Sequence, residues 1–391
     1  MLLIVNAKII TMENRNYDNG YILCEGSIIQ QIGDMAEIPE ISHATILDAK
    51  GCFIYPGMID PHCHIGMLED GVADEGADVN EETDPITPQL RAVDGLYYMD
   101  KAFTEACRAG VTTCVTGPGS ANAIGGVFAA VKTDNRDISQ MVLKEDVAMK
   151  TAFGQNPKFV YGDKKMAPAT RMANVALLRE TFNEAKEYAT KLEQYNADPE
   201  EEDKPDYDSK KEALLPVLNG TLPVKSHAHR ADDVMTALRL SKEFGYTVTI
   251  EHGTEGHLIA DYLAAEQAKV ICGPIISERS KIELRNHTVE TPGILTNKGV
   301  EVAIMTDHPC VPIQYLSLSA MLAVKNGMPY DEALKAITIR AAEFTGIADR
   351  VGSLKVGKDA DLIITDGDLL DFSTNVLYTI INGRVAYDAK G

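Results

Sequence analysis

The sequence predicts an α/β protein built on a (β/α)8 TIM-type barrel, with a small composite β-sandwich domain formed by both termini. Three observations predict this fold. Both ends of the chain consist of short β-prone runs, the long middle alternates eight strand candidates with helix-like runs, and histidine-containing motifs follow several of those strands. Eight alternating strands suit a closed barrel best. We therefore expect the β-sandwich domain at 1–55 plus 352–391 and the barrel at 56–351.

The two ends share a pattern of short apolar runs separated by turn residues such as Asn19 and Gly20. Near the start of the chain these runs are 2–5, 7–10, 21–24, 27–32 and 52–55. Near its end they are 360–364 and 376–384. Two similar ends that flank a different middle predict that the termini pair into one small domain.

The middle of the chain alternates between two patterns. The strand candidates are 59–64, 112–116, 126–133, 148–153, 222–227, 246–252, 268–272 and 300–307. The helix-like runs between them include 100–109, 171–195, 231–244, 258–266 and 331–344. This alternation predicts a parallel sheet, with a doubly wound open sheet as the main competitor. The GxGxxG fingerprint that such an open sheet often carries is missing, which favours the barrel.

Two polar segments interrupt the alternation. Residues 198–211 form a charged insertion, which we expect to be a solvated loop or a frayed helix end. Residues 67–88 are rich in acidic side chains and directly follow the first barrel strand. This second segment is either a wall of an active site or an ordinary surface loop.

The composition limits the classes of function. The chain has 391 residues, of which 45% are hydrophobic, and a formal net charge of −21. Nucleic acids and anionic membranes bind basic surfaces, so we expect neither as a partner. No apolar run reaches the roughly 18 residues of a membrane span, and the first residues lack the pattern of a secretion signal. Seven cysteines without a CxxC pair favour a reducing compartment. We expect a cytoplasmic homo-oligomer that acts on a small-molecule substrate.

The strongest site motif is PGMIDPHCH at 56–64. Alternate side chains of a strand share a face, so His62 and His64 point the same way, about 7 Å apart along the backbone. Two imidazoles in this arrangement can hold one divalent ion. A lone histidine is more often an ordinary polar residue, but further histidine motifs occur downstream. Together they favour a metal site.

Three later strand candidates also end in potential ligands. His227, His252 and Asp307 each end an apolar run. In a (β/α)8 barrel the functional side chains lie at the carboxyl ends of the strands, so we expect these residues to converge with the first histidine pair. His229 shares strand parity with His227 and is the alternative ligand. We prefer His227 because it directly ends its apolar run, which leaves His229 to contact the substrate.

Together these motifs resemble the metal-dependent amidohydrolase superfamily, most closely its imidazolonepropionase-like and prolidase-like branch. The HxH motif on the first barrel strand, single histidines on the fifth and sixth strands and an aspartate on the eighth all match. VNAKI at 5–9 and GSLKVGKDADL at 352–362 match as well, so the resemblance spans nearly the whole chain. It implies a (β/α)8 barrel with a composite β-sandwich and one or two divalent ions. Zinc is the expected ion, and iron or manganese are the alternatives.

Members of this family that bind two ions often bridge them with a carboxylated lysine or a glutamate. Lys150 is a cation within an apolar run, which is costly unless the charge is masked or paired. Carbamylation would turn it into an anionic bridging ligand. The alternative is a lysine that reaches a carboxylate or solvent from the end of a strand. Lys132 is a weaker rival for the same role, and His257 and His308 are expected beside the ligands or at the surface.

The resemblance implies hydrolysis of an amide or cyclic-amide C–N bond in a small molecule, not of peptide bonds in proteins. In this reaction Asp307 would take the proton of the nucleophile and pass it to the departing nitrogen. The enzymatic alternatives are a one-metal deaminase and an imidazolone-type ring hydrolase. The alternative from another class is a scaffold protein on the same barrel that has lost catalysis.

One position departs from the pattern of the deaminating and ring-opening relatives. They typically place a glutamate three residues after the histidine of the fifth strand, where this chain has Arg230. A guanidinium stays protonated and cannot relay a proton, but it can hold a carboxylate. Arg230, and with it Arg279, could therefore bind the anionic end of an N-acyl amino acid or a dipeptide. A surface salt bridge is the safer interpretation for both.

Overall fold

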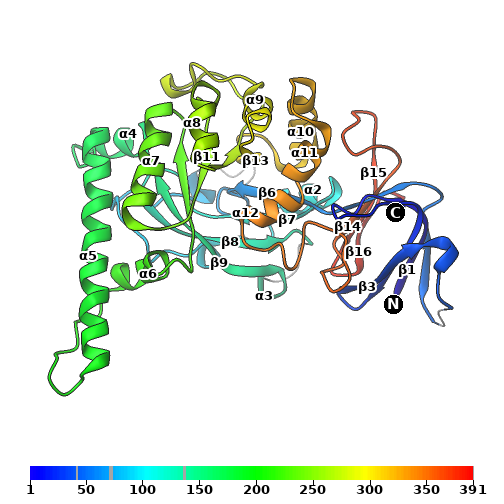
Figure 1. Cartoon of the computed structure of the whole chain (residues 1–391), viewed down its shortest axis with the longest axis horizontal. Coiled ribbons are helices and arrows are strands. Elements are labelled where there is room, and N and C mark those ends of the chain that lie inside the picture. Colours follow the sequence, from blue (N-terminus) through cyan, green and yellow to red (C-terminus); the bar gives the residue numbers. More distant parts are fainter. Residues whose placement is uncertain (41–42, 70–73, 135–137, 391) are drawn as a thin grey trace.

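The computed structural model describes residues 1–40, 43–69, 74–134 and 138–390. Two eight-stranded sheets lie toward opposite ends of the molecule's long axis (Figure 1). The barrel sheet contains β6 to β13. The other sheet, which we call the terminal sheet, contains β1 to β5 and β14 to β16. The predicted α/β fold, a barrel with a separate sheet built from both termini, is therefore confirmed.

The strands of the barrel sheet follow one another in sequence order. They are β6 (Met58–Cys63), β7 (Val111–Thr116), β8 (Ile124–Lys132), β9 (Val142–Ala152), β10 (Val224–Ala228), β11 (Val248–His252), β12 (Lys269–Cys272) and β13 (Glu301–Ile304). Each overlaps one of the predicted strands. Ala228 pairs with His252, and His252 pairs with Cys272. The carboxyl ends of these strands are therefore level, and the residues that follow them converge.

One strand corrects the prediction of a parallel sheet. β8 runs antiparallel to β7 and to β9, whereas the remaining neighbours in the barrel sheet are parallel. The reason lies in the lengths of its connections. A parallel crossover needs a dozen or more residues, and the segments on either side of β8 are only 117–123 and 133–141. Connections of this length suit antiparallel neighbours, and the carboxyl end of β8 therefore points to the opposite end of the barrel.

The first and last strands of the barrel sheet meet through backbone hydrogen bonds. The Asp307 amide donates to the His62 carbonyl at 3.2 Å, and the His64 amide donates to the His308 carbonyl at 2.9 Å. These bonds lie just beyond the ends of β6 and β13, so the barrel is nearly closed at its carboxyl end. Closure brings His62 and Asp307, which lie far apart in sequence, next to each other.

Helices cover the outside of the barrel (Figure 1). They are α1 (Ala92–Gly95), α2 (Lys101–Arg108), α3 (Ile138–Met141), α4 (Gln155–Asp163), α5 (Arg171–Ala197), α6 (Ser209–Leu218), α7 (Ala231–Phe244), α8 (Ala260–Ala265), α9 (Thr291–Asn297), α10 (Leu316–Lys325), α11 (Tyr330–Ala336) and α12 (Ile339–Phe344). α7 illustrates their packing, because Val234, Ala237 and Leu238 recur at helical spacing and are buried in the barrel core. Among the described residues, no helix combines the length and the apolarity needed to cross a membrane.

The charged insertion connects α5 to α6. α5 projects well beyond the barrel (Figure 1), and residues 198–204 after it are exposed. The last part of the predicted insertion is helical, because Asp208 caps α6 by accepting from the amides of Lys210 and Lys211. The segment is therefore a solvated connection followed by a helix start.

The terminal sheet joins the two ends of the chain. Its strands are β1 (Leu2–Ile9), β2 (Tyr17–Glu25), β3 (Ile28–Asp34), β4 (Thr45–Asp48), β5 (Phe53–Pro56), β14 (Leu362–Thr365), β15 (Val376–Ile381) and β16 (Arg384–Asp388). β5 pairs antiparallel with β14, and this pairing links the N-terminal strands to the C-terminal ones. β5 also leads almost directly into β6, the first barrel strand. The terminal sheet is thus fixed to the barrel at the strand that carries the first histidine motif.

Candidate metal centre

The first cluster of potential ligands forms where the barrel closes. His62 lies on β6, His64 directly follows β6, and Asp307 follows β13. One ligand atom from each lies within 4.8 Å of the others. The Oδ1 atom of Asp307 is 3.4 Å from His64 Nε2 and 3.7 Å from His62 Nε2. An oxygen and two ring nitrogens at this spacing can surround one divalent ion.

A second cluster contains the histidines of β10 and β11. His227, His229 and His252 are buried, and one ligand atom from each again lies within 4.8 Å of the others. Their ring centroids are 4.3 to 4.6 Å apart. The structure brings both candidates of the fifth strand into this cluster, so His229 lies among the potential ligands together with His227. The ring centroids of His62 and His252 are 6.0 Å apart, which makes the two clusters neighbours.

Hydrogen bonds to backbone carbonyls orient two of these imidazoles, and a close contact with a carboxylate orients a third. His64 Nδ1 lies 2.8 Å from the carbonyl oxygen of Gly117, and His252 Nδ1 lies 2.8 Å from that of Gly273. His62 Nδ1 lies 2.8 Å from a carboxylate oxygen of Glu251. A ring nitrogen beside an acceptor carries the proton, which leaves Nε2 as the free lone pair. Each Nε2 is therefore prepared to bind a metal ion.

The position of Gly273 depends on the absence of a side chain. A Cβ atom at this residue would lie 2.4 Å from the carbonyl oxygen of Met305, closer than such atoms approach in proteins. The close contact lets the backbone after β12 turn its carbonyl toward His252. A glycine that no ligand motif includes therefore helps to orient a ligand.

Two potential ligands have strained backbones. His252 has φ of 72° and Asp307 has φ of 54°, in the left-handed region that residues with a Cβ atom rarely adopt. Each residue follows or ends a barrel strand at the point where the chain must turn away. Such strain persists where the surrounding structure fixes the conformation, as it does at many functional sites.

Burial keeps the imidazoles neutral. It is the largest cause that lowers the pKa of His62, His227 and His229 well below the usual value, and it lowers the pKa of His252 to about 4. Neutral imidazole is the form that binds metal ions. Burial alone would raise the pKa of Asp307, but His252, His64 and His62 outweigh it and lower that pKa. The cluster therefore holds neutral nitrogens beside an ionised carboxylate.

The donor set fits a divalent ion. His227 Nδ1 lies 2.9 Å from Ser120 Oγ, while its buried Nε2 has no hydrogen-bond partner among the described residues. A buried polar atom without a partner is costly, and a metal ion would satisfy it. Nitrogen and carboxylate ligands in clusters of three suit zinc, and also iron or manganese.

Lys150 lies beside the first cluster. Its side chain is fully buried on β9, with Nζ 3.3 Å from His62 Nε2 and 5.4 Å from the ring centroid of Phe128. Burial lowers the pKa of Lys150 to about 8, against the opposing effects of Glu251 and Asp307. A lysine with this pKa is partly an uncharged amine near neutral pH, which is the form that reacts with carbon dioxide.

Lys132, the rival of Lys150, is not at the site. Its Nζ donates to Asp359 at 2.9 Å and also to Asp361. Arg350 also donates to both carboxylate oxygens of Asp359, at 2.7 and 2.9 Å. The suggestion of Lys132 as a bridging ligand is therefore wrong. β8 runs antiparallel to its neighbours, so its last residue lies at the end of the barrel away from the histidines.

Residues of both clusters, all except His62, line one cavity of about 280 Å³ at the carboxyl end of the barrel. Its walls include Leu68, Val79 and Asn80 from the acid-rich segment 67–88. That segment therefore contributes to the wall, although its residues 70–73 lie outside the described part of the chain. The cavity also receives Asn156 and Lys281 from the segments after β9 and β12.

The structure places the predicted substrate-binding arginines differently. Arg230 forms two hydrogen bonds of 2.9 Å with Asp232, and it is not among the residues that line the cavity. Arg279 donates to the carbonyl of His287 at 2.7 Å. The cavity cation is Lys281, which no motif indicated. The only signal for it in the sequence is its place in a polar segment after a barrel strand, where specificity residues are commonly found.

The remaining predicted histidines have partners outside the ligand clusters. His308 is buried next to Asp307, and its Nδ1 accepts from the Ile313 amide at 3.2 Å. His257 lies 3.1 Å from Thr291 Oγ1 through its Nδ1. Neither belongs to the two ligand clusters of the described residues.

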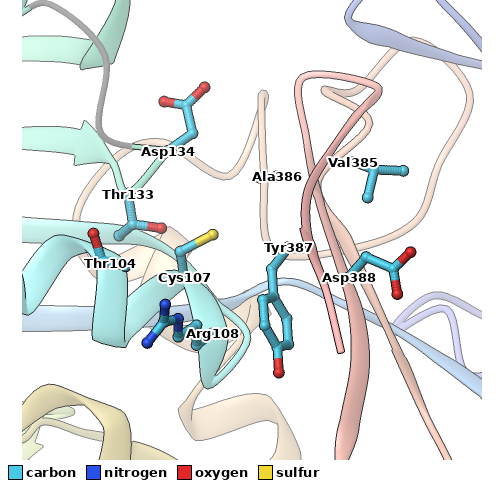
Figure 2. A pocket seen from close by; sticks show the side chains of 9 residues that line it. All are labelled: Thr104, Cys107, Arg108, Thr133, Asp134, Val385, Ala386, Tyr387 and Asp388. Atoms are coloured by element: carbon cyan, nitrogen blue, oxygen red, sulfur yellow. The ribbon is translucent and has the colours of Figure 1, made fainter. Parts of the chain in front are cut away.

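A second cavity, of about 430 Å³, lies at the opposite end of the barrel (Figure 2). Cys107 and Arg108 of α2 face Tyr387 of β16 across it, and Thr133 from the end of β8 completes one side. The Thr133 amide donates to the carbonyl of Thr112, near the start of β7. This cavity therefore lies at the amino end of the parallel strands. None of the described residues that line it is a histidine, so the ligand clusters belong to the first cavity alone.

The comparisons with known proteins agree with this geometry. The model of the Amidohydrolase family matches residues 53–386. An amidohydrolase from Thermotoga maritima has a crystal structure with a TM-score of 0.94 and 36% identity, covering 99% of this chain and 100% of that chain. A Xaa-Pro dipeptidase with bound methionine shares the fold with a TM-score of 0.60 and 18% identity, covering 99% of this chain and 100% of that chain.

Several curated relatives match most of this chain. The amidohydrolase tasK of Hapsidospora irregularis is 28% identical over 94% of this chain, and the match covers 40% of that protein. The chain thus spans less than half the length of this relative. An imidazolonepropionase of Deinococcus radiodurans is 25% identical over 94% of this chain and 90% of its own length. On the match to the family model and on the Thermotoga maritima structure, the chain belongs to the Amidohydrolase family.

Proposed function

We propose that the protein is a metal-dependent hydrolase that cleaves an amide or cyclic-amide C–N bond of a small molecule. The observation that carries this proposal is the pair of buried ligand clusters that line one cavity. A divalent ion bound there would polarise the scissile carbonyl and acidify water. His62, His64 and Asp307 would hold one ion, and His227 or His229 with His252 would hold a second.

Asp307 is the residue that would move the proton. It lines the cavity, and its lowered pKa keeps the carboxylate ionised across the neutral range. An ionised carboxylate can accept a proton from the attacking water. Transfer of this proton to the departing nitrogen would let the C–N bond break without leaving a charged amide anion.

Lys150 would connect the two sites. We propose that it is carbamylated, which replaces a buried cation beside His62 by an anionic ligand that can bridge two ions. The depressed pKa supports this, because the uncharged amine is the reacting form. Mass measurement of the intact site or a crystal structure tests it, and an unmodified Lys150 with a single ion would contradict it.

The competing candidates are a one-metal deaminase and an imidazolone-type ring hydrolase. Such relatives typically place a glutamate as a proton relay three residues after the histidine of the fifth strand. Counted from His227, this position is Arg230, whose guanidinium cannot relay a proton and is bound to Asp232. A scaffold without catalysis is disfavoured because both ligand clusters are complete.

The decisive experiment is a substrate panel with the metal-loaded protein. It contains N-acyl amino acids, dipeptides with proline, cyclic amides, imidazolones and aminated heterocycles. We expect hydrolysis of at least one acyl-amide or cyclic amide, and loss of this activity in the His62→Ala, His64→Ala double variant. Ammonia release from a heterocycle without any acyl-amide cleavage would establish the deaminase instead.

A further inference from the structure

We propose that Lys281 and Asn156 form a subsite that binds a carboxylate group of the substrate. The proposal rests on the hydrolase function proposed above and names its substrate class, acyl-amides that carry a free carboxylate. Both residues line the cavity that contains the two ligand clusters. They come from separate segments at the carboxyl end of the barrel, Asn156 from the start of α4 and Lys281 from just before Ile282–Leu284.

The contact between the two side chains leaves donors free on both. Lys281 Nζ donates to Asn156 Oδ1 at 2.9 Å. An ammonium has three donors, so two remain on Lys281. The bond occupies the amide oxygen of Asn156, so its NH2 group can donate as well. A site that presents an ammonium and an amide NH2 together is complementary to a carboxylate.

Glu283, the neighbouring acid, does not form a close ion pair with Lys281. Glu283 Oε1 lies 4.0 Å from Lys281 Nζ, at the outer limit of an ion pair. Glu283 is buried, and its Oε2 accepts from the Gln155 amide at 2.9 Å, which fixes the carboxylate below the cavity wall. Lys281 is 37% exposed at its side chain, so an entering anion can reach it.

Lys281 is the only lysine or arginine among the described residues that line this cavity. The nearby guanidinium groups are engaged elsewhere, Arg230 with Asp232 and Arg279 with the carbonyl of His287. Lys281 also lies near the second cluster. Glu283 Oε1 is 3.7 Å from His229 Nε2 and 4.0 Å from Lys281 Nζ, so the ammonium lies within about 8 Å of that imidazole. A carboxylate on Lys281 would therefore lie close to the ligand clusters, within the span of one small molecule.

Binding to the metal-free protein tests the subsite independently of catalysis. Removal of metal ions ensures that the carboxylate cannot bind a metal instead. The probes are N-acetyl-L-alanine and its carboxamide, compared by ligand-observed NMR, which detects millimolar affinities. We expect the acid to bind about 10-fold or more tightly than the amide, as is typical of one charge-assisted contact. Lys281→Met should remove this preference and Lys281→Arg should retain most of it.

Two further variants sharpen the test. Asn156→Asp places a carboxylate on Lys281 and should weaken binding of the acid while leaving the amide unchanged. Lys298→Met is the matched control. Lys298 precedes β13 at the other end of the barrel and pairs with Asp261, so this substitution should not change the binding of either probe. Equal binding of acid and amide to the wild type, absence of binding by both, or a preference that survives Lys281→Met would overturn the proposal.

Kinetics on the best acyl-amide of the panel separates this proposal from the function. Lys281→Met should lower kcat/KM about 10- to 100-fold on the acid and less than about 3-fold on its carboxamide. A protein that cleaves no member of the panel but prefers the acid in the binding test would contradict the function and support the subsite. Cleavage of acid and amide at equal rates would support the function and contradict the subsite.

Discussion

Two buried lysines on adjacent strands of the barrel meet opposite environments. Lys132 ends β8 between Asp359 and Asp361, so its charge is neutralised twice. Lys150 lies on β9, where no described carboxylate forms an ion pair with it and its partner is His62 Nε2 at 3.3 Å. One lysine is a structural ion pair, and the other is a cation without a close counter-charge beside potential metal ligands.

The direction of one strand accounts for this difference. Lys150 pairs in register with Gly126, and Lys132 pairs with Thr113, so the two positions are six residues apart along β8 (132 − 126). At the rise of a β-strand this is roughly 20 Å. Because β8 is antiparallel, a lysine at its carboxyl end reaches the terminal sheet, whereas one near the carboxyl end of β9 reaches the histidines.

The two environments imply different tests. Removal of Lys132 should affect folding and leave the metal site intact. Removal of Lys150 should affect the metal site and leave the joint between the sheets intact. The four predictions below follow this division, starting from the metal side with the largest effect.

We expect complete loss of metal binding and turnover in the His62→Ala, His64→Ala double variant. The pair supplies two of the three ligand atoms of the first cluster, and His62 also adjoins Lys150. Elemental analysis of the purified protein measures the effect. His43→Ala, at an exposed position near the terminal sheet, is the control and should keep its metal. Full metal content in the double variant would show that the ion binds elsewhere.

Lys132→Met is expected to destabilise the protein by about 3–5 kcal/mol, because it leaves two buried carboxylates next to each other. Asp359 keeps Arg350, whereas Asp361 loses its cation and, among the described residues, keeps the Asn382 amide at 2.8 Å. Urea unfolding measures the loss. Burial already raises the pKa of Asp361, so the loss should shrink as the pH falls and Asp361 becomes protonated.

The metal content of Lys132→Met shows whether Lys132 has a structural role at the joint or a role at the metal site. Folded Lys132→Met protein should bind as much metal as the wild type, because Lys132 lies at the other end of the barrel. A stable Lys132→Met protein with reduced metal would contradict the assignment of Lys132 to the joint between barrel and terminal sheet.

Asp307→Asn should lower turnover about 100-fold or more while the fold persists. The amide keeps an oxygen as a possible ligand but cannot accept the proton of the nucleophile. Steady-state kinetics on an identified substrate, with circular dichroism as the check on folding, measures the effect. Near-normal activity would exclude Asp307 as the residue that moves the proton.

Much of this arrangement could be predicted from the sequence because it depends on short-range patterns. The eight barrel strands are apolar runs, and the histidines follow directly from their ends, so local periodicity located both. The joining of both termini was also evident from the β-rich runs at the two ends. Each of these runs is a local pattern, whereas the joining of the termini was inferred from the similarity of two distant runs.

The features that were missed depend on connections and loops. The direction of β8 follows from the lengths of its two connecting segments, which a count of strand candidates ignores. Lys281 lines the cavity, whereas Arg230 was predicted to bind the substrate there. The position of Lys281 depends on how the segment after β12 folds over the barrel. Arg230 also has an acid two residues away, and its guanidinium donates to this local partner, Asp232.

The smallest and most specific effect concerns Lys150 in the metal-free protein. Burial lowers its pKa to about 8 from the usual 10.5, so folding penalises the protonated side chain. Lys150→Met should therefore stabilise the metal-free protein by about 1–3 kcal/mol at pH 7, the opposite sign to Lys132→Met.

Between about pH 8 and 10.5 the folded lysine is neutral while the unfolded one still binds a proton, so the stability of the wild type rises with pH. The advantage of Lys150→Met should shrink across this window in urea unfolding of both proteins. An advantage that is independent of pH would mean that Lys150 acts through packing against Phe128 and not through its charge.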